Sequence, residues 1–532
     1  MDEEKHKDLY AKRTSQTKVF RDPIHGLIPI YPWEMELIDT EEFHRLRRIH
    51  QLSMTYLIYH GAEHTRFGHS IGVMHIAGRV LDHLRDYEPL RDLSEDEFFE
   101  KKALVRMAAL LHDIGHGCFS HVGENETNIY PQLNDPVSGD TASGHEVYTR
   151  CIIKERLAGL IEKSWPREKG YCMVQDILMI LSQGTSDPTF RFFDDIISGQ
   201  LDCDKMDYLL RDSHYCGVEY GTYDLERLIC SLRVAEIEGN CVLAISQNGI
   251  QAVESFVLAR YWMFIQVYFH KDRRLFDYYL SSFMKEYLTC SEVKTGMYPE
   301  NLDSYLGLDD SKIQCEIKKY AKAKPAKDTE RICFFAKRLY ERNHHKVVFD
   351  PPYVHYKEKD EEQIEAYKRI SYVHNNILKY LEEEKNGWNM GNVYVDLAKG
   401  STAKHIFDIK VYDEESDPDY RPEHASDKEI PAIPVIPKHG GQVHPIQDYS
   451  FTLRSISDRK ISILRVYAEK SIAEAVQEKC NLWFDNEYTS KTEQLRKEQE
   501  EIAALERKLS EKHEKADNLK KELDISDENY PA

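Results

Sequence analysis

The chain has 532 residues, of which 41% are hydrophobic, and its formal net charge is −21. This length exceeds what one small core requires, so we expect a large lobe, a smaller lobe and a tail. The acidic charge disfavours a long nucleic-acid-binding groove, although it allows a local basic pocket for a small polyphosphate. The 11 cysteines include no Cys-x-x-Cys pair, which disfavours thiolate zinc sites and disulfides and favours a reducing compartment.

The amino terminus and the hydropathy of the chain predict a soluble intracellular protein. Residues 1–17 are polar and charged, without the apolar segment of a signal peptide. No stretch approaches the roughly 18 apolar residues that a membrane span needs. We therefore expect no membrane partner and a location in the cytoplasm or the nucleus.

Residues 18–290 are predicted to be mainly helical. Turns at residues 22–23 and 25–26 separate short extended pieces at the start. A helix should follow an N-cap at Asp39 or Thr40, and its apolar face would carry Phe43, Leu46, Ile49 and Leu52. Further helices are predicted over residues 65–84, 101–111, 145–160, 174–181 and from 250 to beyond 279. Within residues 194–212, four carboxylates recur in a helix-like pattern. A hairpin is predicted over residues 233–246.

After about residue 290 the pattern changes to short helices that alternate with strand-like runs. These runs cover residues 347–349, 392–396, 405–412 and 461–466, and a proline-rich loop that we expect to be exposed and mobile covers 417–445. A heptad of apolar residues runs from Leu495 to Leu523, which favours a coiled coil, with a solvated single helix as the alternative. The predicted parts are a polar tail (1–17), a helical core (18–290), an α+β lobe (291–486) and a charged, coiled-coil-like tail (487–532).

The end of the helix over residues 101–111 carries several residues capable of chemistry. His112 and Asp113 are adjacent, His116 lies one helical turn beyond His112, and His121 follows. Imidazoles and a carboxylate at the end of a buried helix are costly unless something binds them, and a metal ion is the simplest candidate. An adjacent His-Asp pair alone can arise by chance.

Two distant residues strengthen the prediction of a metal site. His69 lies early on another predicted helix, and Asp204 lies in a carboxylate-rich one. With His112 and Asp113 they provide a mixed nitrogen and oxygen ligand set, which suits Fe, Mn, Zn, Co or Ni better than Mg alone. A site with open positions can activate water and polarise a phosphoryl oxygen. The residues alone therefore predict metal-assisted phosphoester hydrolysis.

These residues belong to a longer series of motifs that resembles the HD-domain phosphohydrolases, and more narrowly the deoxynucleoside triphosphate triphosphohydrolases. His69, His112-Asp113 and Asp204 match the H…HD…D signature of that family. The other matching stretches are residues 22–26, 43–47, 51–52, 66–69, 112–117, 119–121, 145–146 and 202–208. They follow the family's order from residue 18 to about residue 280. The resemblance implies a mainly α fold with a helical HD-domain core, and we expect the SAM domain of the vertebrate members to be absent.

The resemblance also implies a role for each matched residue. The metal ligands would be His69, His112, Asp113 and Asp204, with Mg accompanying the substrate phosphates. The catalytic residues near the α-phosphate would be His116, His121, His145, Glu124 and Glu146. Of these, His121 or His145 would protonate the leaving 5′ oxygen, and Glu124 or Glu146 would orient it. The substrate-binding residues would be Gln51, Leu52, Arg66, Lys205, Tyr208, Asp212, Tyr268, His270 and Lys271.

Some of these assignments have plain structural alternatives. Arg66 and Lys205 suit phosphate charge, but either could instead belong to a structural ion pair. Gln51 and Leu52 would select deoxyribose by a tight fit. Tyr208 and Tyr268 would close around the nucleoside or be ordinary core aromatics.

The implied reaction is attack of water on the α-phosphorus of a deoxynucleoside triphosphate, which releases a deoxynucleoside and inorganic triphosphate. The resemblance further implies a homo-oligomer, a dimer or a tetramer, activated by dGTP or GTP between subunits. Lys18, Val19, Asp39, His44 and Arg47 fall at that regulatory site, with His44 in place of the family's usual glutamine. The alternatives are an HD-domain phosphodiesterase or nuclease acting on nucleic acid or a signalling nucleotide, and a non-catalytic sensor or scaffold.

Overall fold

The computed structural model describes residue 15 and residues 18–124, 129–165, 172–290, 295–356, 361–383, 385–389, 391–398, 433–457 and 460–487, with a few single positions between 502 and 515. The chain divides into two compact units, Met1–His344 with Ser401–Arg459, and His345–Gly400 with Lys460–Ala532. The predicted strand at 405–412 and most of the predicted coiled coil lie outside the described residues. The first unit therefore contains two separate stretches of sequence.

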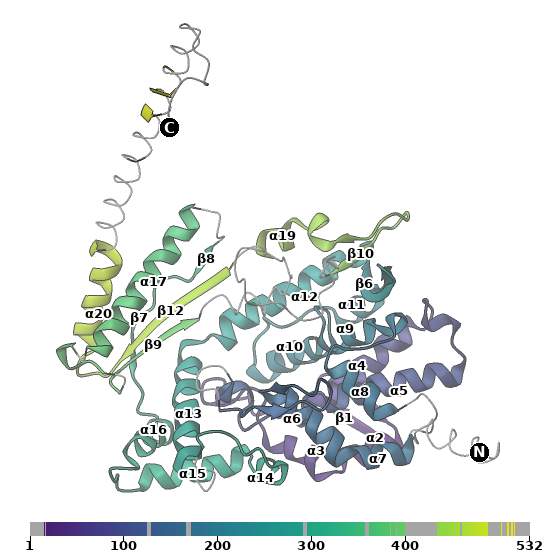
Figure 1. The fold of residues 1–532 in the computed structure, drawn as a ribbon, viewed down its shortest axis with the longest axis horizontal. Helices are drawn as coiled ribbons and strands as arrows, with labels where there is room; N and C mark the ends of the chain where they lie inside the picture. The colour runs from purple at the N-terminus through teal and green to yellow at the C-terminus, as the bar shows by residue number, and fades with distance from the viewer. Residues whose placement is uncertain are drawn as a thin grey trace, which may run out of the picture. The chain divides into compact units, whose positions relative to one another are not determined.

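The first unit is mainly helical, as the sequence predicted (Figure 1). Its long helices are α4 (Arg66–Leu84), α5 (Glu95–Leu111), α10 (Cys203–Cys216), α12 (Ile250–Met263) and α13 (Lys271–Cys290). Helix α5 begins at a capping box formed by Ser94 and Glu97 and buries its carboxyl-terminal half. Helix α4 packs against both α5 and α10, so these three helices form the frame of the site.

Shorter helices complete the unit. They are α2 (Pro32–Ile38), α3 (Glu41–Arg45), α6 (His145–Ile152), α7 (Ala158–Ser164), α8 (Met173–Leu181), α9 (Phe192–Ser198), α11 (Leu225–Ser231), α14 (Leu302–Leu306), α15 (Asp310–Lys322), α16 (Glu330–Tyr340) and α19 (Phe451–Ser457). The predicted long aromatic helix is divided into α12 and α13 by a π-turn over Phe264–Tyr268. Such turns shift the helical register and often occur at functional sites.

The helix predicted after Thr40 is shorter than its apolar spacing suggested. Thr40 does cap α3, because its side chain accepts a hydrogen bond from the Phe43 amide at 3.3 Å. Asp39, the other N-cap candidate, ends α2 instead. The α-helix stops at Arg45 and continues only as a 3₁₀ turn over Leu46–Arg48. The backbone beyond this turn pairs elsewhere, because the Gln51 amide donates to the His64 carbonyl at 3.0 Å. Ile49 and Leu52 are therefore buried without being helical.

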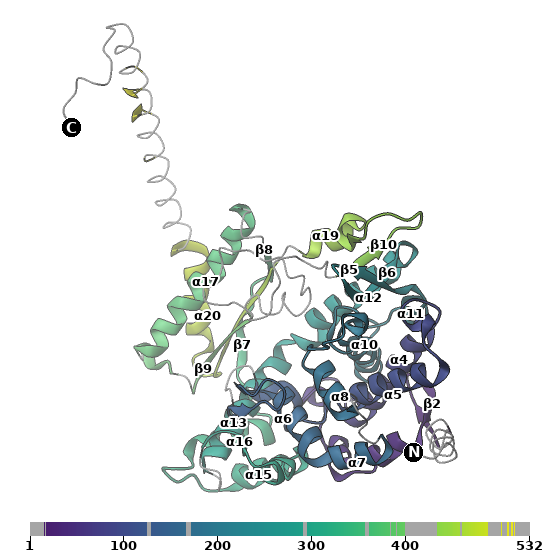
Figure 2. The same cartoon turned by 45° about the vertical axis from the view of Figure 1, so that its right-hand side comes forward.

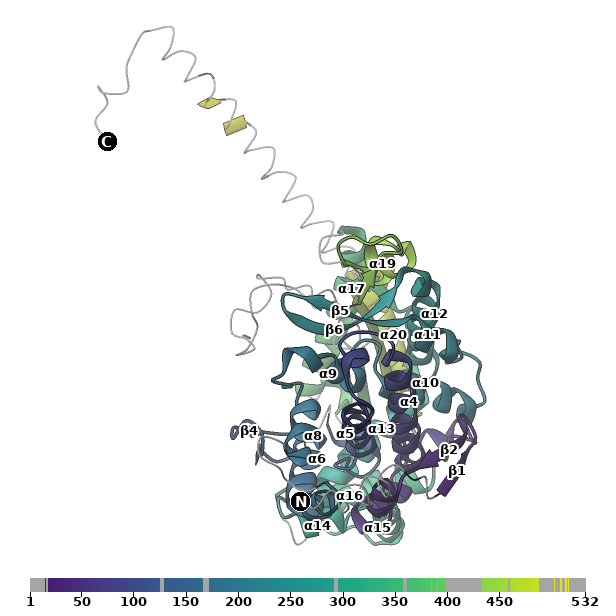
Figure 3. The ribbon, with the colours of Figure 1, turned by 90° about the vertical axis from the view of Figure 1, so that its right-hand side faces the viewer.

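Two small β structures belong to the first unit. Strands β1 (Lys18–Asp22) and β2 (Gly26–Ile30) form an antiparallel hairpin that contacts α4 (Figure 3). The predicted hairpin at 233–246 is confirmed as β5 (Leu232–Ile237) and β6 (Asn240–Ser246). Strand β10 (Pro434–Ile436) pairs in parallel with β6, and β11 (His444–Pro445) pairs with β10 (Figure 2). The end of the proline-rich segment is thus part of a sheet, whereas residues 417–432 lie outside the described residues.

The first unit continues past residue 290, where the sequence predicted a new lobe. Helix α16 packs on α13, and α14 reaches the turn that follows α5. The Tyr305 hydroxyl, which is fully buried, donates to the Gly115 carbonyl at 2.6 Å. Arg45 donates to the carbonyls of Leu308 and His116 at 2.9 and 2.7 Å. These contacts explain why residues 295–344 join the helical unit.

The second unit is an α+β structure. Its strands are β7 (Lys346–Phe349), β8 (Val354–Tyr356), β9 (Val393–Ala398) and β12 (Lys460–Ala468), and the first three each pair antiparallel with β12. Helices α17 (Glu361–Glu382) and α20 (Ala473–Leu482) pack against this sheet (Figure 2). The core includes Val373, Ile377, Val466, Cys480 and Trp483. Among the helices described in either unit, none has the length and apolar character to cross a membrane.

Candidate metal centre and active site

Four predicted ligands from three helices lie together in the first unit. His69 comes from the first turn of α4, His112 caps the end of α5 and is followed by Asp113, and Asp204 lies in the first turn of α10. His69 Nε2 lies 2.9 Å from Asp204 Oδ1 and 3.6 Å from Asp113 Oδ2. His112 Nε2 lies 3.3 Å from Asp113 Oδ1 and 3.7 Å from Asp204 Oδ1. Two imidazole nitrogens therefore face two carboxylates.

The orientation of both imidazoles fits a bound cation. His69 Nδ1 is hydrogen-bonded to Asp207 Oδ2 at 2.8 Å, and His112 Nδ1 to the Ala109 carbonyl at 2.7 Å. Each Nε2 atom is buried and has no hydrogen-bond partner of suitable geometry among the described residues. Metal-binding histidines commonly engage the second ring nitrogen in this way, which leaves the first nitrogen for the metal. The donor set thus fits a divalent transition metal.

Electrostatics favours the charged forms of these groups before any cation binds. Burial opposes protonation of His69, but the carboxylates of Asp204 and Asp207 raise its pKa to about 10. Burial likewise opposes the charge on Asp113, yet Arg66 and His112 keep the pKa of Asp113 well below its usual range. Binding of a cation would therefore displace a proton from His69.

A second cluster of imidazoles lies beside the first. His116 Nε2 is 3.3 Å from Asp113 Oδ1, and the His116 ring stacks on His145 with a centroid distance of 3.7 Å. Glu124 joins the group, because one carboxylate oxygen lies 2.6 Å from His121 Nδ1 and the other is hydrogen-bonded to His145 Nδ1. One carboxylate therefore orients both imidazoles.

The two carboxylates considered for this orienting role differ in geometry. The Glu124 side chain is 19% exposed and carries two imidazole contacts, whereas the Glu146 side chain is 60% exposed and lies 3.7 Å from His145 Nδ1. Burial opposes protonation of His145, but Glu124 raises its pKa to about 9. The geometry favours Glu124 as the orienting group.

The loop between these clusters has a strained backbone held by residues that the sequence motifs did not identify. Phe119 and Ser120 both have positive φ angles, 57° and 60°, at a cost on the order of 1–3 kcal/mol each. The Phe119 amide donates to Asp310 Oδ1 at 2.6 Å, and Ser120 Oγ donates to the His50 carbonyl at 2.7 Å. Asp310, from α15, also lies 2.7 Å from His50 Nδ1. Contacts that span 70 and 191 residues of sequence therefore hold this loop in place.

Asp212 links one residue predicted to bind the sugar and base to a histidine that the sequence left unassigned. His64 Nε2 lies 2.7 Å from Asp212 Oδ1, and the Tyr268 hydroxyl donates to Asp212 Oδ2 at 2.7 Å. Tyr208 lies edge-on to Tyr268, with ring centroids 6.3 Å apart. Gln51 is buried, and its Oε1 atom has no hydrogen-bond partner within the described part of the chain.

The structure also describes Leu52 and the two predicted residues that lie just after the π-turn, His270 and Lys271. Leu52 is 6% exposed and follows Gln51 directly. His270 is half-buried, with its ring 5.9 Å from that of Tyr59, and Lys271 is exposed at the start of α13. A role for these residues in substrate binding stays a prediction.

The two predicted phosphate-binding cations have protein partners in the structure. Arg66 pairs with Asp113, and its Nε donates to Ser120 Oγ at 2.8 Å. Lys205 Nζ lies 2.5 Å from Asp202 Oδ2 and donates to the Gly199 carbonyl at 3.1 Å. A phosphate would therefore have to add to or replace existing contacts of these side chains.

The residues of the predicted regulatory site lie on the surface of the first unit. Lys18 and Val19 are exposed on β1, with Val19 55% accessible. The side chains of Asp39 and His44 are 58% and 45% exposed and approach to 4.0 Å. The Arg47 guanidinium lies over the Phe67 ring at 3.4 Å. These positions are accessible, and nucleotide binding there stays a prediction.

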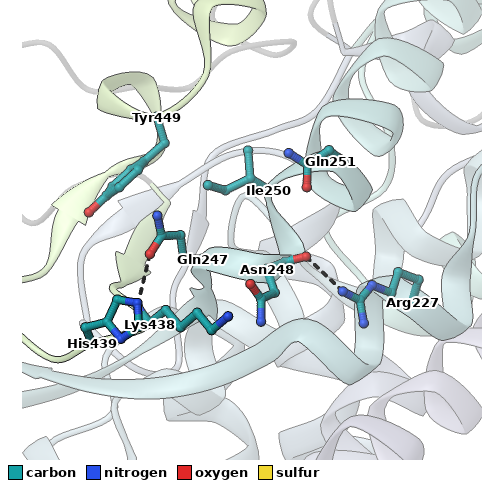
Figure 4. Close-up of a pocket in the computed structure, with 8 residues that line it drawn as sticks. All are labelled: Arg227, Gln247, Asn248, Ile250, Gln251, Lys438, His439 and Tyr449. Atoms are coloured by element: carbon teal, nitrogen blue, oxygen red, sulfur yellow. Dashed lines mark hydrogen bonds between the residues drawn. The ribbon is translucent and has the colours of Figure 1, made fainter.

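A separate cavity of about 560 Å³ lies in the same unit (Figure 4). It is lined by Arg227, Gln247, Asn248, Ile250, Gln251, Lys438, His439 and Tyr449. The Lys438 amide donates to Gln247 Oε1 at 3.0 Å, and Arg227 donates to the Asn248 carbonyl at 2.9 Å. None of the described residues that line this cavity is a position predicted for catalysis or regulation. The cavity forms where the segment after residue 433 meets α11 and α12.

In this site a His-Asp pair follows one helix, and a His and an Asp come from two other helices. This arrangement is that of an HD-type centre, and comparisons with known proteins agree. The HD domain model matches residues 66–176, and the model of an HD associated region matches residues 223–405. Residues 66–176 are thus matched by the HD domain, and the chain is similar over part of its length to the SAMHD1 triphosphohydrolases.

Curated relatives match about half of this chain. An uncharacterized protein of Bacillus subtilis is 38% identical over 265 residues, covering 49% of this chain and 54% of the relative. Deoxynucleoside triphosphate triphosphohydrolase SAMHD1 of Gallus gallus is 34% identical over 238 residues, covering 41% of this chain and 37% of that protein. The matches thus span about half or less of the length of these relatives.

Solved structures match over most of the chain. A hypothetical protein from Aquifex aeolicus has a TM-score of 0.62 at 26% identity, covering 87% of this chain and 99% of that one. A phosphohydrolase from Bacteroides thetaiotaomicron has a TM-score of 0.58 at 24% identity, covering 85% of this chain and 100% of that one. The second likeness concerns the fold alone.

Proposed function

We propose that the protein hydrolyses deoxynucleoside triphosphates to deoxynucleosides and inorganic triphosphate in a metal-dependent reaction. The observation that carries the proposal is the pair of buried Nε2 atoms of His69 and His112, which face Asp113 and Asp204 beside a separate imidazole cluster. The homology to SAMHD1 supports the choice of substrate.

In this proposal His69, His112, Asp113 and Asp204 hold a divalent cation. A cation there would supply Lewis-acid activation of water and of a phosphoryl oxygen. Arg66 would hold Asp113 in the orientation that the ligand set needs, because it contacts that carboxylate and Ser120 together. Mg would accompany the substrate phosphates.

The second cluster would bind the α-phosphate and supply a proton to the leaving 5′ oxygen. His121 and His145 both engage Nδ1 with Glu124, so each has Nε2 available to the substrate. His116, wedged between Asp113 and His145, would contact a phosphate oxygen. We assign the proton donation to His121 or His145 and the orienting role to Glu124, with Glu146 at the exposed edge.

The Glu124→Gln variant should move the alkaline limb of the kcat/KM profile to lower pH. With Glu124 present, the raised pKa keeps His145 protonated until the pH rises through about 9. Loss of the carboxylate removes the main stabilisation of the imidazolium. The His145 donor should then lose its proton nearer the ordinary histidine pKa of about 6.5. Steady-state rates between about pH 6 and about pH 10 would show the shift. Glu155→Gln, the same change on an exposed part of the neighbouring helical segment, serves as the control. Alkaline limbs at the same pH in both variants would contradict the orienting role of Glu124.

Selectivity for a deoxynucleotide would come from the group around Asp212. Tyr268 and His64 both bond to the Asp212 carboxylate, which would fix it against the sugar, while Tyr208 would pack beside the base. Gln51 and Leu52 would restrict the space at the 2′ position. His270, Lys271 and Lys205 would neutralise the outer phosphates.

Regulation by a guanine nucleotide is a second part of the proposal. dGTP or GTP would bind at Lys18, Val19, Asp39, His44 and Arg47, between subunits of a dimer or tetramer. The exposure of these residues allows such an interface. A basal activity that does not change when dGTP or GTP is added would count against this part.

Product analysis with each dNTP and NTP, in the presence of Mn, Mg, Fe or Co, tests the reaction directly. We expect inorganic triphosphate and a deoxynucleoside in equal amounts from dNTPs, and little turnover of NTPs. Release of pyrophosphate or of a monophosphate would instead indicate a phosphodiesterase or nuclease and would refute the proposed reaction. Cleavage of oligonucleotides would point the same way.

A further inference from the structure

A buried network connects the turn of the β1–β2 hairpin to the proposed metal ligand His69. His25 Nε2 lies 2.6 Å from Asp207 Oδ1, and the other carboxylate oxygen lies 2.8 Å from His69 Nδ1. The exposed fractions of the His25, Asp207 and His69 side chains are 2%, 0% and 0%. Neither His25 nor Asp207 has a role in the proposed reaction itself. We propose that His25 is a positioning residue, which orients His69 toward the cation by fixing the carboxylate of Asp207.

The Asp207 carboxylate has no spare acceptor site. Oδ1 accepts from His25 and from Arg211 Nη2 at 2.8 Å, and Oδ2 accepts from His69 and from Arg211 Nε at 2.7 Å. Four donors match the roughly four lone-pair sites of a carboxylate. The plane of the carboxylate is thereby set on both sides, so the imidazole of His69 cannot rotate without breaking a buried hydrogen bond.

The packing at α4 shows how closely this carboxylate is held. Gly72 lies one turn after His69, and a Cβ atom there would collide with Asp207 Oδ1 and lie 2.6 Å from Arg211 Nη2. Glycine in a helix interior costs about 1 kcal/mol relative to alanine. The carboxylate occupies the space that a side chain at position 72 would need.

The hairpin supplies His25 through a specific turn. Asp22 Oδ1 accepts from the amides of Ile24 and His25 at 2.8 and 3.0 Å, and Gly26 follows with a φ of 73°. Asp22 Oδ2 accepts from Arg211 Nη1 at 2.9 Å. The same aspartate thus shapes the turn and holds the guanidinium that clamps Asp207. Asp22 therefore supports the proposed metal ligand His69 through Arg211 and Asp207.

The inference rests on the metal centre of the proposed function, and it is tested without any nucleotide. His25→Met and His25→Gln are matched in size, but only glutamine keeps a donor that can reach Asp207. We expect His25→Met to raise the dissociation constant for Co²⁺ about 10- to 100-fold, with a changed visible absorption spectrum of the bound Co²⁺. His25→Gln should stay within about three-fold of the unmodified protein.

Stability controls separate positioning from a merely structural role. Glu34→Gln weakens another fully buried ion pair, with Arg106 Nε at 2.6 Å, and should lower the melting temperature without changing Co²⁺ affinity. If His25→Met does not fold, Asp22→Asn, which loosens Arg211, should still weaken Co²⁺ binding severalfold. Unchanged Co²⁺ affinity in the folded variants, or no Co²⁺ binding by the unmodified protein, would overturn the inference. If the variants showed the expected order of Co²⁺ affinities but the unmodified protein did not hydrolyse dNTPs, the positioning role of His25 would stand and the proposed reaction would be refuted.

Discussion

Replacement of Asp113 by asparagine should lower kcat/KM for a deoxynucleoside triphosphate by roughly a thousand-fold or more. Asp113 approaches both proposed ligand nitrogens, at 3.3 Å from His112 Nε2 and 3.6 Å from His69 Nε2. An amide lacks the negative charge and offers one acceptor atom instead of two. We expect the metal content of the purified variant, measured by elemental analysis, to fall together with turnover.

The same substitution has a cost in stability that must be measured separately. Arg66 is 3% exposed and pairs with Asp113, and an unpaired buried charge costs about 3–5 kcal/mol. Asp135→Asn provides the control, because it weakens a comparable buried pair with Arg150 Nε at 3.0 Å. We expect both variants to melt earlier and only Asp113→Asn to lose metal. Full metal occupancy and normal turnover in Asp113→Asn would refute its role as a ligand.

The Gly115→Ala variant should lose about 2–4 kcal/mol of unfolding free energy and about a hundred-fold in activity. A Cβ atom at position 115 would collide with the Thr149 amide and the His145 carbonyl, and it would lie 2.6 Å from Thr149 Oγ1. Helix α6 would have to move away from the loop. That movement would shift His145 relative to His116, on which it stacks.

Gly159→Ala offers a matched control on a nearby helix. Gly159 lies within α7, and nothing approaches within 4 Å of the position its Cβ would take. Alanine there should raise the unfolding free energy by up to about 1 kcal/mol, because it reduces the freedom of the unfolded chain. Chemical denaturation of both variants, with rates per folded molecule, checks the prediction. Equal stability of the two variants would show that α6 tolerates the added methyl group.

The sequence predicted much of the site because its residues occur in short, ordered motifs. His112 and Asp113 are adjacent, His69 lies early on a helix whose apolar spacing is clear, and Asp204 lies in a run of carboxylates with a helix-like pattern. The structure brings these four residues together. Their chemical roles stay predictions, which the variants above address.

The parts that the sequence did not predict depend on contacts between distant segments. Asp207 is one of several carboxylates on α10, and its contact with His25 spans 182 residues. Asp310 follows the change in sequence pattern near residue 290 that predicts a lobe boundary, yet it holds the Phe119 amide. The short α3 passes into a 3₁₀ turn, and the backbone beyond that turn pairs with the segment before α4, a competition that side-chain spacing does not reveal.

The return of the chain to the first unit has a consequence for how the protein can be divided. Strand β6 pairs with β5 on one side and with β10, almost 190 residues later, on the other. A chain that stopped at residue 344 would keep the ligand set but leave β6 as an open edge. Unpaired edges recruit strands from other molecules and favour aggregation. The helical unit is therefore better isolated by shortening the segment of residues 345–400 than by truncating the chain at residue 344.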